Sequence, residues 1–300
     1  MSLRSGKAPR RTRQEKQMIV EAHAKINWSL DITGRRGDGY HLVDMILQRI
    51  SLCDTLEVLP SEDLSLALDP ESSFSAPPDG SNLILRAARA LRERAGENRG
   101  ASFILKKRIP SGAGLGGGSA DAAAALLALN RLWELDLPLN ELEALSLPIG
   151  ADIPFCLHRE AMRVTGIGEI LSPLPALPER HLVLLKGPEG LDTGSVYRRY
   201  DQSAVPSAYR HERAAAALMS PRADLKSALT NVLEPPACSL CPRIRADIGR
   251  LYSAGASFAQ MTGSGSAVYG VFEDENRAGA ACLSLKEAVP ECVCIAASTI

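Results

Sequence analysis

A glycine-rich run from Pro110 to Ser119 constrains the fold of this chain more than any other segment. It reads PSGAGLGGGS and holds five glycines within seven residues. The pattern from Ala101 to Ile109 predicts a strand before it, and the Ala- and Leu-rich sequence after Ser119 predicts a strong helix. Backbone N–H groups in such a loop, together with the N-terminus of the helix, bind anions well. The unit therefore predicts a phosphate-binding loop.

The predicted phosphate contact covers the whole loop and the start of the helix. We expect Ser119 either to cap this helix or to offer its hydroxyl to a phosphate or a metal ion. A flexible glycine hinge is the alternative interpretation, but a hinge requires neither a strand before it nor an Ala-rich helix after it. The residues assigned to the phosphate contact are Pro110, Ser111, Gly112, Ala113, Gly114, Leu115, Gly116, Gly117, Gly118, Ser119 and Ala120.

The surroundings of the loop decide between classes of nucleotide site. Three of its glycines fit the pattern GxGxxG, but a dinucleotide fold needs a second strand that ends in an acidic residue about 20 positions further on. Here Glu134 and Asp136 lie at the end of the same helix, and Pro138 follows without a strand between. No Gly-Lys-Ser/Thr sequence closes the loop, which excludes a P-loop. The loop is therefore predicted to hold a nucleoside triphosphate by a third route.

Composition limits the fold and the partners. A chain of 300 residues that is 45% hydrophobic can bury a large core, as one domain or as two fused lobes. Strand and helix patterns alternate irregularly, which predicts an α+β fold. The net charge of -1 predicts no general affinity for nucleic acid, and no apolar run is long enough to predict a membrane span. The sequence leaves the oligomeric state open.

The small net charge conceals a basic N-terminus. Met1 to Gln17 contains six Lys or Arg and one Glu, a charge of +5, so that the remaining residues sum to -6. We expect residues 1–17 to form a disordered basic tail. A targeting segment or an RNA-tethering arm is the alternative interpretation.

The cysteines indicate a cellular compartment. Seven cysteines are scattered along the chain, and an odd, dispersed set is not a disulfide framework. A secretory signal is not evident. We therefore expect reduced thiols and a cytoplasmic location.

A second candidate segment lies near the N-terminus. Polar and apolar residues alternate from Lys25 to Ile32, which predicts a half-buried strand with Lys25 and Asn27 on the same face. The glycine-rich loop that follows this strand leads to Tyr40 and His41.

Three ordered segments together resemble the GHMP kinases, the superfamily of galactokinase, homoserine kinase and mevalonate kinase. Ala24 to Asn27 resembles the first motif, Pro110 to Ala124 the second and Met261 to Ser266 the third. Within the superfamily, the run from Ala24 to Val58 and the turn GADIPFCL are similar to a family that phosphorylates a cytidine-diphosphate-linked methylerythritol in the non-mevalonate isoprenoid pathway. The order and spacing match from about Ile19 to the C-terminus.

The resemblance implies a fold, a phosphoryl donor and a small-molecule acceptor. It implies a two-lobed α+β GHMP kinase fold, with a ribosomal-S5-like N-terminal domain over residues 18–165 and a ferredoxin-like C-terminal domain over residues 166–300. ATP would be the donor, with Mg²⁺, and the 2-hydroxyl of the cytidylated methylerythritol the acceptor. Two alternatives stay open at this point: another GHMP kinase that acts on a different alcohol, and a nucleotide-binding relative without turnover.

The resemblance also implies two catalytic residues. Asp152 matches the family's catalytic aspartate, whose carboxylate would accept the proton of the attacking hydroxyl or orient that hydroxyl. Lys25 matches the catalytic lysine, which would keep Asp152 ionised and offset charge on the transferred phosphoryl group. The residue patterns alone would favour solvated surface positions for both.

The remaining assignments concern the substrate and the metal ion. Tyr40 and His41 match the pair that recognises cytosine, and Asn27 would bind substrate or position Lys25. The turn Thr262-Gly263-Ser264 would bring backbone N–H groups to the β-phosphate of ATP or to the diphosphate of the substrate. Ser119 is the expected direct contact of Mg²⁺.

Overall fold

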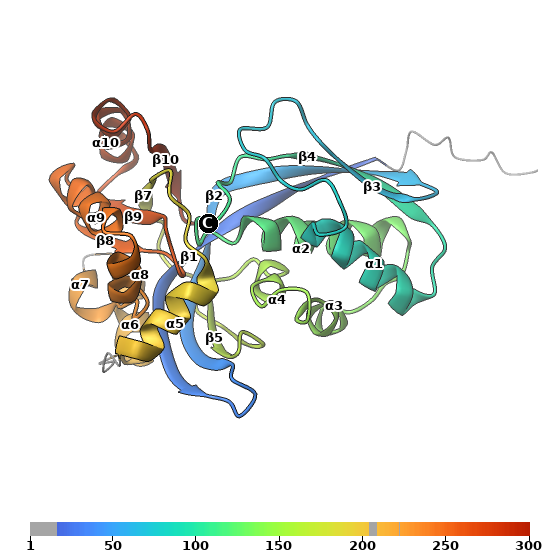
Figure 1. The fold of residues 1–300 in the computed structure, drawn as a ribbon, viewed down its shortest axis with the longest axis horizontal. Coiled ribbons are helices and arrows are strands. Elements are labelled where there is room, and N and C mark those ends of the chain that lie inside the picture. Colours follow the sequence, from blue (N-terminus) through green and yellow to red (C-terminus); the bar gives the residue numbers. More distant parts are fainter. Residues whose placement is uncertain (1–16, 204–208, 222) are drawn as a thin grey trace, which may run out of the picture.

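The computed structural model describes residues 17–203, 209–221 and 223–300. The predicted basic tail lies outside these residues, apart from Gln17. The described chain forms two halves, each built on its own sheet (Figure 1). In that view α1 (Leu83–Ala95), α2 (Gly117–Leu132) and α3 (Leu139–Ser146) belong to one half, whereas α9 (Arg243–Ser253) and α10 (Glu275–Ala288) belong to the other.

The remaining helices are short. They are α4 (Ile153–Cys156), α5 (Thr193–Ser203), α6 (His211–Met219), α7 (Leu225–Ala228) and α8 (Glu234–Leu240). The strands of the first sheet are β1 (Met18–Arg35), β2 (His41–Ser61), β3 (Leu64–Leu68), β4 (Gly100–Lys106), β5 (Met162–Gly166) and β6 (Ile170–Pro173). Those of the second sheet are β7 (His181–Lys186), β8 (Phe258–Met261), β9 (Val268–Phe272) and β10 (Val293–Ser298).

The first sheet extends further along the chain than the predicted domain boundary. Its strand order is β3-β4-β2-β5-β6, with β1 paired to β2 beside this path. All pairs are antiparallel except β3–β4. A division between residues 165 and 166 would cut through β5, because β5 and β6 complete this sheet as a hairpin. The first sheet therefore ends at Pro173, and the predicted boundary falls within its last hairpin.

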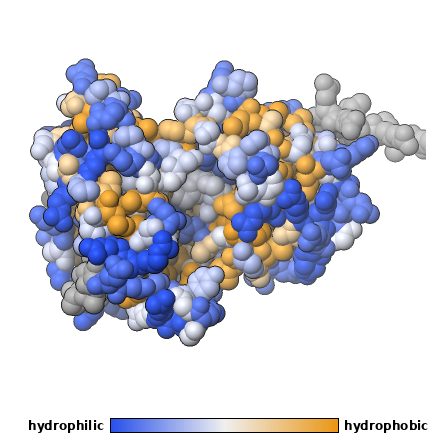
Figure 2. All heavy atoms as spheres, viewed as in Figure 1, coloured by the Kyte–Doolittle hydropathy of each residue, from blue (hydrophilic) through white to orange (hydrophobic). Residues whose placement is uncertain are grey.

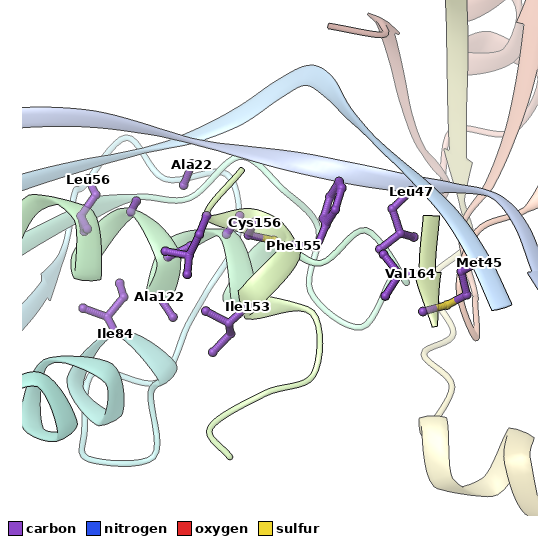
Figure 3. Packing of buried hydrophobic residues seen from close by; sticks show 14 of the residues in the cluster. Ala22, Met45, Leu47, Leu56, Ile84, Ala122, Ile153, Phe155, Cys156 and Val164 are labelled. Atoms are coloured by element: carbon purple, nitrogen blue, oxygen red, sulfur yellow. The ribbon is translucent and has the colours of Figure 1, made fainter. Parts of the chain in front are cut away.

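Helices α1 and α2 cover one face of the first sheet. Figure 3 shows Ile84 of α1 and Ala122 of α2 below Leu56 and Ala22, which extend from the strands above them. The small side chains of α2 let the helix approach the sheet closely, since Ala122 to Ala125 are all buried. The helix that follows the glycine loop is thus fixed against the sheet along its length.

The C-terminal half has the ferredoxin-like arrangement that the family resemblance implied. Helices α5 to α8 follow β7 as an insertion, and without them the elements have the order β7-α9-β8-β9-α10-β10. The strands lie side by side as β10-β7-β9-β8 with every neighbouring pair antiparallel. This is the βαββαβ pattern in which two helices cover one face of a four-stranded sheet. The α+β, two-sheet prediction is confirmed.

Strand β1 joins the two halves, and the half-buried pattern predicted for it is wrong. Its residues from Ala24 to Asp31 are all buried, on both faces. Trp28 packs edge-on against Tyr269 of β9 with ring centroids 5.5 Å apart, and the Tyr269 hydroxyl donates a hydrogen bond of 3.1 Å to the Asn27 carbonyl. The second half therefore packs against the face of β1 that carries Ile26 and Trp28.

The chain after α7 contributes to the same joint. The sequence pattern from Leu225 to Leu233 predicts a helix, but α7 ends at Ala228. The chain then runs beside β1, where the Leu30 N–H donates to the Thr230 carbonyl and the Val232 N–H donates to the Leu30 carbonyl. These hydrogen bonds to β1 take the place of the hydrogen bonds that a longer helix would form. In the described residues, no helix is long and apolar enough to span a bilayer.

Replacement of the α1 cap tests the local stability of the first half. The Asn82 Oδ1 accepts a hydrogen bond of 2.9 Å from the Ile84 N–H, and its Nδ2 donates to the Pro77 carbonyl. Asn82→Ala is expected to lower the free energy of unfolding by about 1–2 kcal/mol, because it leaves the helix N–H unpaired. Urea denaturation measures this. Glu93→Ala, at an exposed position of α1, is the control and should change stability by less than about 0.5 kcal/mol; equal effects would contradict the capping role.

Candidate active site

A large cavity lies between the two halves. Its volume is about 1120 Å³, and Figure 2 shows the surface hollowed between the halves. Lys25, Asn27 and Asp152 line this cavity together, although the first two lie on β1 and the third begins α4. The structure therefore brings together residues that the sequence separates by more than a hundred positions.

A second cavity lies along the glycine loop. Its volume is about 500 Å³, and it is lined by every residue from Pro110 to Ser119 together with residues of the loop before α1. Gly112, Gly114 and Ser119 line both cavities. Ala120 lines neither, since it is buried in the first turn of α2. The loop thus separates two spaces, and its exposed backbone faces both.

The helix after the loop begins earlier than predicted. Gly116 is the N-cap of α2, with φ of 69°, and Gly117 is the first helical residue. The expectation that Ser119 caps the helix is therefore wrong, because Ser119 lies within the first turn. Its hydroxyl is not used as the cap and lies on the wall shared by the two cavities.

The glycine loop packs directly on the turn between β8 and β9. A Cβ on Gly114 would lie 2.3 Å from the Thr262 carbonyl oxygen, so only glycine fits at this position. The Ala267 N–H donates a hydrogen bond of 3.2 Å to the Ala113 carbonyl. The two glycine-rich segments, one from each half, therefore form a single wall of the site.

Asn231 holds this turn through two hydrogen bonds to backbone carbonyls. Its Nδ2 donates to the Met261 carbonyl at 3.0 Å and to the Gly263 carbonyl at 2.8 Å. Thr262 is fully buried, and its Oγ1 accepts a hydrogen bond of 3.0 Å from the Asn27 N–H, whereas Gly263 and Ser264 line the cavity. The sequence prediction did not include Asn231.

Lys25 is a buried cation with two oxygen partners. Its side chain is 4% exposed, and its Nζ lies 2.8 Å from Asn27 Oδ1 and 3.4 Å from Asp152 Oδ2. The pairing register between β1 and β2 shifts on both sides of the Lys25–Asn27 segment, and such irregularities redirect side chains. The ammonium therefore reaches the cavity from a strand that is covered on both faces.

Gly116 allows the glycine loop to lie over the stem of this lysine. A Cβ on Gly116 would lie 2.9 Å from Lys25 Cγ. The Lys25 N–H donates a hydrogen bond of 2.9 Å to the Leu115 carbonyl, which holds the loop against β1. The loop and the lysine are thus fixed to each other by backbone and by packing.

Apolar contacts hold Asp152 opposite Lys25. Asp152 is the N-cap of α4, and Pro154 in the first turn has the φ that a helix start requires. Ile153 and Phe155 are fully buried, and Figure 3 shows Ile153 facing α1 and α2 whereas Phe155 extends toward Leu47. The Asp152 carboxylate is 34% exposed, so that it faces the cavity from a rigid support.

An aromatic cluster lies at the far end of the large cavity. Tyr40 is 61% exposed at its rim, and the His41 ring lies against Tyr197 of α5 with centroids 4.8 Å apart. Burial, with a smaller contribution from the charge of Asp152, raises the pKa of Tyr197 to about 12, so that it is neutral at physiological pH. Tyr200 meets the His41 ring edge-on.

Helix α5 was absent from the sequence prediction. Only Val196, Tyr197 and Tyr200 are apolar or aromatic among the charged and polar residues from Thr193 to Ser203. One signal was present: the Asp192 carboxylate accepts hydrogen bonds from the Ser195 N–H and hydroxyl, the typical start of a helix. Recognition of that cap would have placed Tyr197 on a helix.

A buried ion network beneath the glycine loop was also missed. Lys107 pairs with Asp54 and, at 2.8 Å, with Asp121 in the first turn of α2. Asp54 accepts hydrogen bonds from the N–H groups of Arg108 and Ile109, where the loop begins. Burial raises the pKa of Asp121 to about 8 against the opposing effect of the Lys107 charge. The network fixes the start of the loop and the helix after it.

The family comparisons match this architecture. A profile described as GHMP kinases N terminal domain matches residues 82–160, and one described as GHMP kinases C terminal matches residues 213–291. A solved homoserine kinase from Cytophaga hutchinsonii shares the fold, with a TM-score of 0.70 over 100% of this chain and 97% of that chain at 16% identity. The protein is a GHMP kinase by its fold and by both of its domains.

Closer relatives narrow the family. A 4-diphosphocytidyl-2-C-methyl-D-erythritol kinase from Paramagnetospirillum magneticum is 41% identical over 278 residues, 90% of this chain and 94% of the relative. One from Bacillus pumilus is 38% identical over 261 residues, 87% and 90% of the two chains. A crystal structure of 4-(cytidine 5'-diphospho)-2C-methyl-D-erythritol kinase has a TM-score of 0.79 at 34% identity and covers 94% of this chain and 99% of that one. The chain belongs to the 4-diphosphocytidyl-2-C-methyl-D-erythritol kinase family.

Two glycine substitutions test the close packing of the loop. Gly114 and Gly112 both have positive φ, 74° and 62° respectively. A Cβ on Gly114 would meet the Thr262 carbonyl, whereas a Cβ on Gly112 would meet no atom within 4 Å. Gly112→Ala should cost only backbone strain of about 1 kcal/mol. Gly114→Ala should lower the free energy of unfolding by at least about 2 kcal/mol more than Gly112→Ala does. It should also weaken ATP binding, because the added Cβ pushes the glycine loop away from the turn between β8 and β9. Urea unfolding and calorimetry measure both, and equal losses would refute the close contact.

The pH dependence of stability tests the ion network. The folded state keeps a proton on Asp121 between its ordinary pKa of 3.8 and a pKa of about 8, whereas the unfolded chain releases it. The contribution of this carboxyl to stability is therefore full below pH 3.8 and is lost as the pH rises toward 8.

Asp121→Asn should flatten this fall in the free energy of unfolding, measured by urea denaturation at a series of pH values. Glu93→Gln, which removes an exposed carboxylate from α1, is the control and should leave the slope unchanged. A slope that is the same in Asp121→Asn and in the unaltered protein would contradict the raised pKa.

Proposed function

We propose that this protein transfers the γ-phosphoryl group of ATP to the 2-hydroxyl of 4-diphosphocytidyl-2-C-methyl-D-erythritol. The observation that carries the proposal is the pair of Lys25 and Asp152, 3.4 Å apart in the large cavity and beside a glycine loop open to two cavities. The names of the relatives, which are about 40% identical over most of the chain, support the choice of substrate. The relatives favour the cytidylated methylerythritol over a different alcohol as the acceptor.

The glycine loop is proposed to bind the phosphates of ATP. Its residues Gly112 to Gly118 present backbone N–H groups, and the N-terminus of the 16-residue helix α2 adds partial positive charge. The second cavity, which is lined by this loop and by Ala76, Pro77 and Ser81 to Leu83, is the proposed place of the nucleoside. In this account backbone dipoles supply most of the attraction for the phosphates, in agreement with the near-neutral charge of the chain.

The residues at the loop fit a Mg²⁺ ion that is held chiefly by phosphates and water. Among the described residues, no group of three or more His, Cys, Asp or Glu is arranged to hold a metal. Ser119 offers a hydroxyl oxygen on the wall shared by the two cavities, and Mg²⁺ prefers oxygen ligands and keeps several waters. The ion would neutralise charge on the phosphates, and Ser119 would contact it.

Asp152 is proposed to receive or orient the substrate hydroxyl. Its carboxylate is partly exposed to the cavity, so that a hydroxyl can reach it, and α4 holds it in place. Lys25 lies 3.4 Å from Asp152 and would offset negative charge that develops on the phosphoryl group. Asn27 fixes the Lys25 ammonium through the hydrogen bond of 2.8 Å. In phosphoryl transfer such positioning and charge compensation carry most of the catalysis.

The aromatic cluster is proposed to bind the cytosine of the substrate. Tyr40 and Tyr197 offer ring faces at the end of the large cavity, and His41 offers a ring nitrogen. Gly263 and Ser264 of the turn after β8 line the large cavity and would face the diphosphate with their backbone N–H groups, whereas the Thr262 N–H donates to the Ala267 carbonyl. The cytoplasmic location stays a prediction from the cysteine content.

Substitution of the two proposed catalytic residues tests the function. Asp152→Asn and Lys25→Met should each lower kcat by about 10²–10⁴-fold with the cytidylated substrate, because each removes a group that acts on the reacting atoms. ADP release measures the rate, with and without the substrate. Lys106→Met, on β4 outside both cavities, is the control and should keep full activity. ADP release that does not depend on the substrate, or full activity in both variants, would overturn the proposal.

A further inference from the structure

The His41 imidazole forms a hydrogen bond with a carboxylate of the other half of the molecule. The His41 Nε2 lies 2.7 Å from Oδ1 of Asp201, near the C-terminal end of α5. The His41 ring is 13% exposed and lines the large cavity, whereas Asp201 does not line it. Asp201 therefore acts on the cavity through the lining residues that it contacts, His41 and Arg35.

One face of α5 surrounds the His41 ring. Tyr197, Tyr200 and Asp201 are related by the spacing i, i+3 and i+4, which places them on the same side of a helix. The two tyrosines contact the ring by its face and its edge, with centroids 4.8 Å and 6.4 Å away. Ring contacts and the hydrogen bond together fix the orientation of His41, which residues of β2 alone would leave free to rotate.

Asp201 also joins the two halves at this end of the cavity. Its Oδ2 lies 3.5 Å from the Arg35 guanidinium, and Arg35 is paired with His41 across β1 and β2. One carboxylate thus bridges a guanidinium and an imidazole on neighbouring strands. This contact places α5 against the end of the β1–β2 hairpin.

The hydrogen bond fixes the position of the imidazole proton. An ionised carboxylate can only accept, so that Nε2 must donate and carries the proton. A neutral imidazole with its proton on Nε2 has a lone pair on Nδ1, which can then accept a hydrogen bond from a ligand. The 4-amino group of cytosine is a donor, whereas the corresponding oxygen of uracil is an acceptor.

We propose that Asp201 is a positioning residue for base recognition: it holds His41 with the proton on Nε2, so that Nδ1 accepts from the amino group of cytosine and the site favours cytidine over uridine ligands. This inference rests on the proposed function, because it assumes that the aromatic cluster binds the base of the substrate. It adds a residue outside the cavity that controls which base the cavity accepts.

Binding of two nucleotides tests the proposal without turnover. Titration calorimetry of the full chain with cytidine diphosphate and with uridine diphosphate compares Asp201→Asn, Asp201→Glu and the unaltered protein. Asp201→Asn should weaken cytidine diphosphate about tenfold and remove most of the preference over uridine diphosphate, since it loses a charge-assisted hydrogen bond. Asp201→Glu should restore part of the preference. Gln202→Ala, at the next and exposed position of α5, is the control and should bind as the unaltered protein does.

Two further readouts separate positioning from a general structural role. In ¹⁵N spectra of histidine-labelled protein, assigned with His41→Gln, the His41 signals should show protonation at Nε2, and Asp201→Asn should change them. In steady-state kinetics Asp201→Asn should raise KM for the cytidylated substrate about tenfold and leave KM for ATP within about twofold.

The outcomes distinguish this inference from the proposed function. An Asp201→Asn variant that keeps the affinity and the preference for cytidine diphosphate would overturn the inference, as would equal losses of ATP and cytidine diphosphate binding. Unaltered protein that does not prefer cytidine diphosphate would overturn it as well. If the predicted binding losses occur but the unaltered protein releases no ADP with the cytidylated substrate, the inference stands and the proposed function fails.

Discussion

The site depends on how the protein compensates the buried ammonium of Lys25. A cation removed from water is unfavourable unless oxygen atoms surround it. Asn27 and Asp152 supply two such atoms, and the open side of the ammonium faces the cavity. A ligand with several phosphates would complete this compensation, so the arrangement favours an anionic ligand at the point where the glycine loop also faces the cavity.

Compensation of this charge requires both halves of the molecule. Strand β1 carries Lys25, whose stem lies under the glycine loop, and the second sheet packs on this strand through contacts such as that of Trp28 with Tyr269. The turn between β8 and β9 presses on the glycine loop at Gly114. The aromatic cluster likewise joins His41 of one half to α5 of the other. Each part of the site therefore lies on an interface between the halves.

The sequence predicts local elements of the site better than their surroundings. The glycine loop, the helix after it and the motif residues Lys25 and Asp152 follow from local pattern and from the family resemblance. The burial of β1 does not, because alternation describes one strand and not the distant segment that covers it. Ser119 was misplaced as a cap, since glycines gave no sign that α2 begins at Gly117. Asn231 and the Lys107 network depend on long-range contacts that no local pattern reveals, whereas the Asp192 cap is a local signal for the helix that carries Tyr197.

A double-mutant cycle of Lys25→Met and Asp152→Asn tests the central claim most directly, that the two residues act as one unit. Single-turnover rates of phosphoryl transfer are measured for each variant and for the double variant with saturating ATP and substrate. Residues that act as a unit are strongly non-additive. The account predicts that the double variant is no slower than the slower single variant. A rate loss in the double variant that equals the product of the two single losses would show that the residues contribute independently and would contradict the account.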